Sequence, residues 1–325
     1  MGILVVGSVA LDSVKTPFGE VTAALGGSAT HFAAAASFFT KVHMVGVVGE
    51  DFPMGDLDFL KKRQVDLSGI QIKKGKTFRW RGRYGFDLNV AETLETHLNV
   101  FSDFSPEIPP AFQNMDLVFL GNIHPKLQKQ VLRQVKKPKL TALDTMNFWI
   151  GGELGALKDV ISEVDLVIIN EGEARELSQE ASLVKAAKKI RSWGPKILII
   201  KRGEYGALLF LKDETFSAPG LPLESVKDPT GAGDSFAGGF MGYLASQGEV
   251  TMTSLRQAVI IGSVMASFNV EDFSCNRLRN LTSVEIKQRA AEFKKLSHFE
   301  EIKIDRYYLG GDTALPLKPP SGLRG

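Results

Sequence analysis

Short apolar runs alternate with longer amphipathic segments along most of the chain. The runs are Ile3–Val6, His43–Gly49, Leu117–Gly121, Lys139–Asp144, Leu166–Asn170 and Ile197–Ile200. Apolar runs of this length are typical of strands that are buried on both faces. A helical spacing of apolar residues marks Ser28–Phe39, Lys126–Val135 and Ser182–Trp193, the last beginning with a serine cap. This alternation predicts an α/β fold in which helices cover both faces of a mostly parallel sheet.

Two segments depart from this pattern. Leu11–Ala23 consists of short extended pieces around a Pro-Phe-Gly turn, and Gln71–Phe101 alternates with a period of two residues. In the second segment one parity is aromatic (Phe78, Trp80, Tyr84 and Phe86) and the other is cationic (Arg79, Arg81 and Arg83). A period of two is that of a β-strand, so the two segments predict a small sheet beside the main domain.

The two faces of this small sheet need different surroundings. The aromatic face is too apolar to stay in water, and we expect the bound substrate, the main domain or a second subunit to cover it, the last giving a homodimer. The arginine face is either a solvated surface or the source of an arginine that pairs with an anionic substrate. We expect one domain over residues 1–310, with lid segments at about 11–23 and 71–101, and a C-terminal extension over 311–325.

Composition narrows the class of protein. The chain has 325 residues and a net charge of only +2, so no overall field points to nucleic acid or a membrane as its partner. No apolar window approaches the roughly 18 residues of a membrane span, and the first residues lack the basic start of a signal peptide. The single cysteine, Cys275, excludes an internal disulfide and suits a reducing compartment. We expect a cytoplasmic protein that acts on a small molecule.

The stretch DPTGAGDSFAGGF, Asp228–Phe240, carries the strongest candidate chemistry. Gly231 and Gly233 let the backbone approach a ligand closely, and a helix start behind them offers unpaired N–H groups to an anion. Asp234 stands inside this anion cradle, where a carboxylate makes sense as a proton acceptor beside a bound phosphate. The alternative is a plain helix start with an aspartate in its first turn, which the helix dipole also favours.

This stretch strongly resembles the C-terminal signature of the PfkB/ribokinase family of sugar and nucleoside kinases. Four further segments resemble that family in the same order: GSVALD (7–12), GGSATHFA (26–33), NEGE (170–173) and KRGEYG (201–206). The resemblance implies a three-layer α/β/α ribokinase-like domain with a mostly parallel sheet and a small β-sheet lid. It also implies transfer of the γ-phosphoryl group of ATP to an alcohol, with Mg²⁺ as a cofactor.

The resemblance further implies roles for individual residues. The catalytic group would be Asp234 as general base, with the backbone N–H groups of Gly231, Ala232 and Gly233. The acceptor would be bound by Asp12, Gly26, Gly27 and His31. The nucleotide side would comprise Asn170, Glu173, Lys201, Gly203 and Gly206, with Asn170 and Glu173 holding Mg²⁺ through water. Taken alone, Asn170 and Glu173 also fit a helix cap and its first turn. Asp228 and Thr230 match half of a monovalent cation site, but residues 269–274 match its other half poorly, which leaves dependence on K⁺ open.

The acceptor is the least determined part of this interpretation. Where the family usually has asparagine, this chain has His31, which either contacts the substrate or packs within its helix. We interpret the chain as a kinase of a small sugar-like acceptor, with an adenosine-type nucleoside kinase as the alternative because the aromatic lid strand offers rings that stack on a base. A catalytically silent nucleotide sensor is disfavoured because binding alone does not need Asp234. An RNA-binding module is disfavoured because three arginines make a small electrostatic footprint.

Overall fold

The computed structural model describes residues 1–301, and the predicted extension over 311–325 lies outside them. A nine-stranded sheet runs through the molecule. Its strands, in spatial order, are β13 (Thr215–Ala218), β12 (Ala207–Phe210), β11 (Ile197–Lys201), β10 (Leu166–Asn170), β9 (Leu140–Leu143), β8 (Leu117–Leu120), β1 (Ile3–Val6), β4 (Val42–Gly49) and β5 (Asp66–Lys73). The six predicted apolar runs are all strands of this sheet, and the strands from β11 to β5 are parallel. The mostly parallel sheet is therefore confirmed. The antiparallel strands β12 and β13 at one end of it, of which β13 is the edge strand, are additions that the sequence analysis did not predict.

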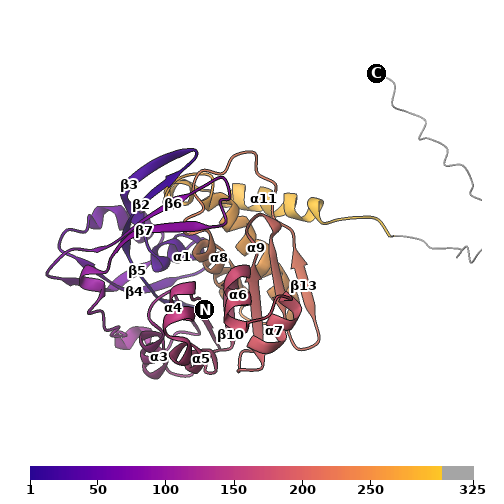
Figure 1. Cartoon of the computed structure of the whole chain (residues 1–325), viewed down its shortest axis with the longest axis horizontal. Helices are drawn as coiled ribbons and strands as arrows, with labels where there is room; N and C mark the ends of the chain where they lie inside the picture. Colours follow the sequence, from indigo (N-terminus) through magenta and orange to yellow (C-terminus); the bar gives the residue numbers. More distant parts are fainter. Residues whose placement is uncertain (302–325) are drawn as a thin grey trace, which may run out of the picture.

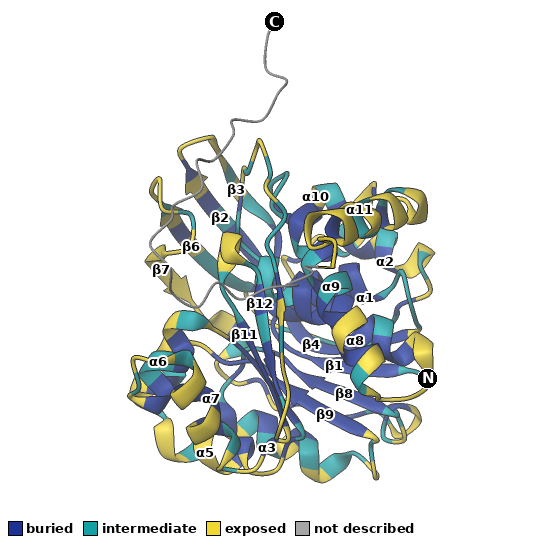
Figure 2. Cartoon of the chain, turned by 90° about the vertical axis from the view of Figure 1, so that its right-hand side faces the viewer, coloured by how far each residue is buried: buried dark blue, intermediate teal, exposed yellow. Residues whose placement is uncertain are grey.

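Helices cover both faces of this sheet, as Figure 2 shows. They are α1 (Ser28–Ala36), α2 (Asp58–Lys62), α3 (Pro125–Gln134), α4 (Asn147–Gly152), α5 (Leu154–Ile161), α6 (Glu171–Ser178), α7 (Leu183–Arg191), α8 (Ala232–Gln247), α9 (Met252–Asn269), α10 (Asn276–Arg279) and α11 (Ser283–Leu296). The Ser182 cap of α7 is confirmed, since its side chain accepts a hydrogen bond from the Lys185 N–H. Helix α3 starts one residue before the predicted Lys126, because the His124 side chain caps it.

Alternate residues of each strand pack into two separate cores. In β1, Ile3 and Val5 join the core beneath α1, α8 and α9, whereas Leu4 and Val6 join the core beneath α3, α5, α6 and α7. This is why the strands read as continuous apolar runs: both faces are buried, and a polar residue on either face would lose its water without gaining a partner. Among residues 1–301, no helix is both long enough and apolar enough to cross a membrane.

A second, four-stranded sheet stands beside the main sheet and forms a lid (Figure 1). Its strands, in spatial order, are β3 (Gly19–Gly26), β2 (Ala10–Thr16), β6 (Phe78–Tyr84) and β7 (Ala91–His97). The predicted lid segment at 71–101 is wrong at its start, because residues up to Lys73 belong to β5 of the main sheet. The first lid segment extends to Gly26, so the Gly26-Gly27 pair lies where the lid returns to the main domain.

Strand register decides where the two faces of the lid point. Strands β2 and β6 are parallel and Asp12 is the partner of Trp80, so the aromatic parity lies on the same face as Asp12. On that face the Thr230 hydroxyl donates to the Tyr84 hydroxyl of the lid (3.3 Å). The main domain thus covers part of the aromatic face, although Phe86, beyond the end of β6, remains 91% exposed.

The arginines at alternate positions of β6 lie on the opposite face of the lid. Their ion pairs are Arg79 with Asp51 (2.9 Å), Arg81 with Glu95 (3.1 Å) and Arg83 with Glu92. The hypothesis that one of these arginines reaches the cleft is wrong for this structure, because a strand side chain cannot serve both faces. A homodimer through the lid stays a prediction.

Candidate active site

The glycine loop and the start of α8 form the centre of the site. Gly231 has a φ of 75°, a left-handed conformation that favours glycine, and a Cβ there would collide with the His31 ring. The Ala232 N–H donates to the Pro229 carbonyl (3.1 Å). No backbone carbonyl of residues 1–301 accepts from Gly231 or Gly233. The predicted cradle of three N–H groups is thus reduced to two free donors, Gly231 and Gly233, because Ala232 closes the turn.

Asp234, in the first turn of α8, belongs to a cluster of three carboxylates around one ammonium group. Lys201, at the end of β11, donates to Asp144 Oδ2 (3.0 Å), and Asp144 directly follows β9. Burial and the negative charge of Asp144 raise the pKa of Asp234 to about 7, against the opposing effect of Lys201. A carboxyl with a pKa in this range can accept a proton near neutral pH and release it again. The cluster therefore has the chemistry of a general base, with Asp144 and Lys201 adjusting its basicity.

Glu173 is the third carboxylate of this cluster. Burial and the charge of Asp144 raise its pKa to about 8. Asn170 and Glu173 also form a capping box at the start of α6: the Asn170 side chain accepts from the Glu173 N–H (2.8 Å) and the Glu173 carboxylate from the Asn170 N–H (2.7 Å). The structural alternative for this pair, a helix cap and its first turn, is therefore present in α6.

The charge balance of the cluster fits a divalent cation. Asp144, Glu173 and Asp234 oppose only Lys201. Burial, together with the negative charge of neighbouring carboxylates, raises two of the three carboxyl pKa values. Within residues 1–301 there is no group of three acidic, histidine or cysteine side chains with the spacing of direct metal ligands. Mg²⁺ usually keeps several of its waters, so carboxylates that act through water suit it.

Asp12 lies on the lid side of the site, at the position where the sequence predicted acceptor binding. Burial raises its pKa to about 7, and its Oδ1 has no hydrogen-bond partner within the described part of the chain. A Cβ on Gly26 would collide with the Asp12 carboxylate, so glycine is required for this carboxylate to lie against the neighbouring lid strand β3. The cavity between the lid and the main domain is lined by Asp12, His31 and Asp228 and measures only about 10 Å³. This space is far smaller than a typical small-molecule site.

His31 lies beneath the glycine loop, where a network of hydrogen bonds holds it. It is only 2% exposed, and burial lowers its pKa to about 4, so its ring is neutral. Its Nδ1 lies 3.0 Å from Oδ1 of Asn269, which also accepts from the Ser235 hydroxyl (3.0 Å). The Asn269 amide donates to the Thr230 carbonyl (2.8 Å). The buried side-chain amide of Asn269 thus links Thr230, before Gly231, to Ser235 in the first turn of α8.

The comparisons with known proteins agree with this geometry. A model of the pfkB family carbohydrate kinases matches residues 3–280. The chain belongs to the PfkB family. The cytidine kinase of Thermococcus kodakarensis is 32% identical over 250 residues, covering 75% of this chain and 88% of the relative. This PfkB chain is therefore a kinase of the sugar or nucleoside type.

Solved structures show the same fold at lower identity. A putative ribokinase II from E. coli in complex with ATP and Mg²⁺ superposes with a TM-score of 0.73 at 18% identity, covering 89% of this chain and 99% of that one. The nucleoside kinase of Burkholderia thailandensis in complex with inosine has a TM-score of 0.70 at 20% identity, covering 91% and 98%. The three-layer ribokinase-like fold is thus confirmed, and the family and the first neighbour support ATP and Mg²⁺ as cofactors.

The end of β11 and the turn after it carry Lys201, Gly203 and Gly206, which the sequence assigned to the nucleotide. Gly203 and Gly206 have positive φ values of 55° and 88°, and the Arg202 N–H donates to the Gly206 carbonyl (2.8 Å). A Cβ on Gly203 would collide with the Asn89 side chain, which lies in the loop between β6 and β7. The tip of the lid therefore reaches the turn that the sequence assigned to the nucleotide, and the role of this turn in nucleotide binding stays a prediction.

The predicted monovalent cation site has a structural explanation of its own. Asp228 is only 1% exposed, and its two carboxylate oxygens accept from the N–H groups of Thr230 (2.9 Å) and Ser274 (3.3 Å). These bonds join the glycine loop to the segment after α9. The carboxylate is thereby engaged as a structural acceptor, and a role for Asp228 and Thr230 in binding K⁺ stays a prediction.

Two residues of the site had no role of this kind in the sequence interpretation. Asp144 ends a predicted strand as Asn170 and Lys201 end theirs, and the carboxyl ends of parallel strands share one edge of the sheet, so this signal was available. Asn269 entered the sequence interpretation only as the first residue of the segment 269–274, which matches the family's cation site poorly. It ends a long apolar helix, and only the packing of α9 against α8 brings it to the loop.

Proposed function

We propose that this PfkB kinase transfers the γ-phosphoryl group of MgATP to a hydroxyl of a nucleoside. The single observation that carries the nucleoside assignment is the position of Trp80. Its indole lies against Gly82, where any Cβ would collide with the ring, and its Nε1 donates to the Thr93 hydroxyl (3.2 Å). The ring therefore lies flat along β6, on the face that also carries Asp12. One flat aromatic surface beside a hydroxyl-binding carboxylate suits an acceptor that has both a base and a ribose.

Asp234 acts as the general base in this proposal. Its carboxylate takes the proton of the acceptor hydroxyl while the hydroxyl oxygen forms a bond to the γ-phosphorus. The bond between the γ-phosphorus and its bridging oxygen breaks, and ADP carries away the electron pair. The N–H groups of Gly231 and Gly233 stabilise the charge on the transferring group, and losing one such donor typically costs about 2.7–4 kcal/mol.

The remaining site residues position the reactants. Asp12 accepts hydrogen bonds from acceptor hydroxyls, and its unpartnered buried oxygen leaves it free to do so. Lys201 is held by Asp144 at the side of Gly233, where its ammonium faces the phosphate chain. Mg²⁺, held through water by Glu173 and Asn170, would neutralise charge on the phosphate oxygens.

A panel of acceptors tests this proposal. ADP release is measured with cytidine, other nucleosides, free sugars and sugar acids, and we expect nucleosides, cytidine among them, to be the preferred acceptors. Replacing Trp80 with leucine should raise the nucleoside KM at least about fivefold, because stacking on a base contributes roughly 1–3 kcal/mol. The matched control is Phe78→Leu on the same face of β6, since Phe78 stacks on Phe101 instead (5.2 Å between ring centroids).

The sugar alternative makes the opposite forecast. A free sugar has no ring that stacks on Trp80, so the Trp80→Leu variant would keep its KM and a sugar would be the fastest acceptor. That pair of results would reject the nucleoside assignment while leaving the kinase itself intact. The relationship to a cytidine kinase supports the nucleoside side, because that relative is matched over most of its length.

A further inference from the structure

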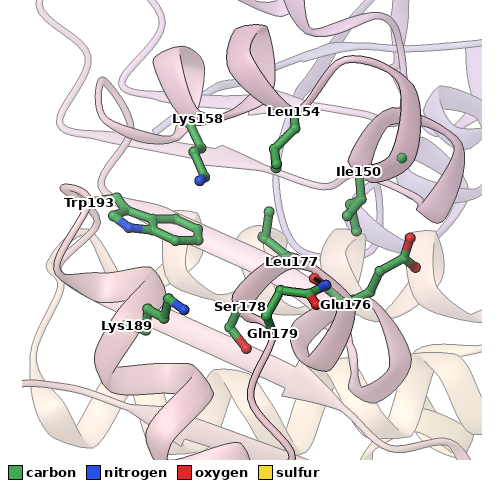
Figure 3. Close-up of a pocket in the computed structure, with 10 residues that line it drawn as sticks. Ile150, Leu154, Lys158, Glu176, Leu177, Ser178, Gln179, Lys189 and Trp193 are labelled. Carbon is green, nitrogen blue, oxygen red and sulfur yellow. Dashed lines mark hydrogen bonds between the residues drawn. The ribbon is translucent and has the colours of Figure 1, made fainter.

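A second cavity lies outside the catalytic site, on the face of the main sheet that carries α4 to α7 (Figure 3). Its volume is about 290 Å³, close to the lower end for small-molecule sites. The lining comes from four helices, from Gln179 directly after α6 and from the turn after α7. It includes Leu154, Lys158, Glu176, Leu177, Lys189 and Trp193. This cavity has no part in the phosphoryl-transfer scheme.

The lining divides into an apolar part and a cationic, aromatic part. Figure 3 shows Leu154, Leu177 and Ile150 on one side of the cavity and Trp193 on the other, with the two lysines extending toward the side of Trp193. The Lys158 ammonium lies 4.9 Å from the centroid of the Trp193 ring. Leu177 is almost fully buried, whereas Leu154 is 38% exposed at the rim.

The two lysines come from different helices, Lys158 from α5 and Lys189 from α7. Within residues 1–301 neither has a carboxylate at ion-pair distance, whereas Lys129 on neighbouring α3 is paired with both Asp159 (3.7 Å) and Glu163 (2.9 Å). Both ammonium groups are exposed, and the Glu176 carboxylate, which accepts from the Asn147 side chain (2.7 Å), also lines the cavity. An anion that contacts both lysines gains from each positive charge. An indole and an apolar floor add the surface on which a flat ring stacks.

We infer that this cavity binds a small flat heteroaromatic compound with one negatively charged group. The ring would lie between Trp193 and the apolar side, and the anionic group would lie between Lys158 and Lys189. A phosphate on a nucleoside and a carboxylate on an aromatic ring both satisfy this chemistry. The neutral counterparts of these compounds lack the group that the lysines recognise.

The cavity is physically linked to the active site by α6. The last turn of this helix, Glu176 to Ser178, lines the cavity, and its first turn carries Glu173 of the carboxylate cluster. A ligand that moves α6 would therefore move Glu173. This consequence rests on the proposed kinase function, whereas ligand binding itself does not.

Fluorescence of Trp193 tests the binding site directly. The chain has three tryptophans, so a full-length Trp80→Phe, Trp149→Phe background leaves Trp193 as the only reporter. The probes are CMP and nicotinate, their neutral counterparts cytidine and nicotinamide, and inorganic phosphate alone. We expect saturable quenching by CMP or nicotinate, at least about tenfold tighter than by the neutral counterpart. Whichever of the two binds identifies the anionic group as a phosphate or a carboxylate.

Lysine variants locate the binding. Lys158→Gln and Lys189→Gln should each weaken binding at least about fivefold, as expected when a charge-assisted contact is lost. Lys188→Gln is the matched control, since Lys188 is exposed on the same helix but does not line the cavity. The inference is overturned if no aromatic anion quenches saturably, if inorganic phosphate alone does so equally, or if all three lysine variants behave alike.

Kinetics test the link through α6. With a saturating amount of the bound probe, the Mg²⁺ concentration for half-maximal phosphorylation should change in the parent chain but not in Lys158→Gln. An unchanged Mg²⁺ titration would reject the coupling and leave the fluorescence result standing. A chain with no kinase activity on any acceptor would reject the proposed function, and the binding measurement would be unaffected.

Discussion

At the scale of single residues, the charge around Asp234 decides how the site works. A lone aspartate in water is ionised at neutral pH and is a weak base. Burial and the charge of Asp144 bring the Asp234 pKa to about 7, while Lys201, paired with Asp144 at 3.0 Å, acts in the opposite direction. The reactivity of Asp234 therefore belongs to the cluster, and it can be adjusted without touching Asp234 itself.

This cluster predicts the pH dependence of the kinase. The base must be ionised, so kcat/KM should fall as the pH drops below about 7, and Asp234→Asn should lower kcat roughly 10²–10⁴-fold. Asp144→Asn removes a negative neighbour, which makes the ionised form of Asp234 easier to reach. The midpoint of the acid limb should therefore move downward by about one pH unit. The measurement is a kcat/KM profile, with Asp159→Asn as the control, and an unmoved midpoint in Asp144→Asn would contradict the role of Asp144.

At the scale of elements, the end of α9 holds the start of α8. Asn269 is fully buried, and its side chain contacts His31, Ser235 and the Thr230 carbonyl. The glycine loop has little side-chain surface of its own, so its shape depends on such outside contacts. His31 takes part by filling the space beneath Gly231, which explains why a ring is accommodated where the family usually has asparagine.

Removing the Asn269 side chain should therefore impair catalysis more than stability. In Asn269→Ala, the loop loses the hydrogen bonds that hold it at Thr230 and at Ser235. The value of kcat should then fall at least about tenfold, which corresponds to a rise of about 1.4 kcal/mol in the activation free energy. The melting temperature will also fall, because buried partners lose a hydrogen bond. Ser267→Ala is the control: it removes a buried hydroxyl from the same helix, so it should lower the melting temperature but leave kcat unchanged. Equal kcat losses in both variants would refute a specific role for Asn269.

At the scale of the whole molecule, the active site lies between the main domain and its lid, and the burial of charged groups there lowers the stability of the fold. Asp12 joins the lid to the site, its pKa is raised to about 7 by burial, and one of its oxygens has no partner among the described residues. A group whose pKa is raised on folding stabilises the fold fully only below its unfolded pKa of about 4, and that stability is lost as the pH rises toward 7. The protein thus keeps a destabilising carboxylate where the acceptor is expected to bind.

The variant Asp12→Asn should accordingly be more stable than the parent and less active. The asparagine side chain is neutral at every pH. The melting temperature of the variant should therefore exceed that of the parent by about 2 °C or more at pH 8. This difference should shrink as the pH is lowered from 7 to 4, where the parent carboxyl becomes protonated. Thermal melts of both proteins across this range are the measurement. A difference that does not depend on pH would show that the Asp12 charge is not the cause.

The extent of what the sequence predicts differs between fold and site. Apolar runs such as Ile3–Val6 predicted the parallel strands because a strand buried on both faces has no other composition. The antiparallel strand β13 was not predicted, because an edge strand with two exposed residues has no continuous apolar run. Local motifs also assigned roles to Asp234, Asn170 and Lys201, which lie at strand ends and helix starts, and these roles stay predictions.

By itself, the sequence determined the fold, the glycine loop and the kinase family, because each depends on residues that are neighbours along the chain or repeat with a fixed period. Only the tertiary structure decided which face of the lid meets the cleft. A shift of one residue in the pairing of β6 with β2 would turn Trp80 away from the cleft and its neighbouring arginines toward it. The tertiary structure also decided that Asp144 adjusts Asp234 and that Asn269 supports the loop. Those effects depend on distances between residues far apart in the sequence, and burial gives them their strength because water no longer screens the charges or replaces the hydrogen bonds.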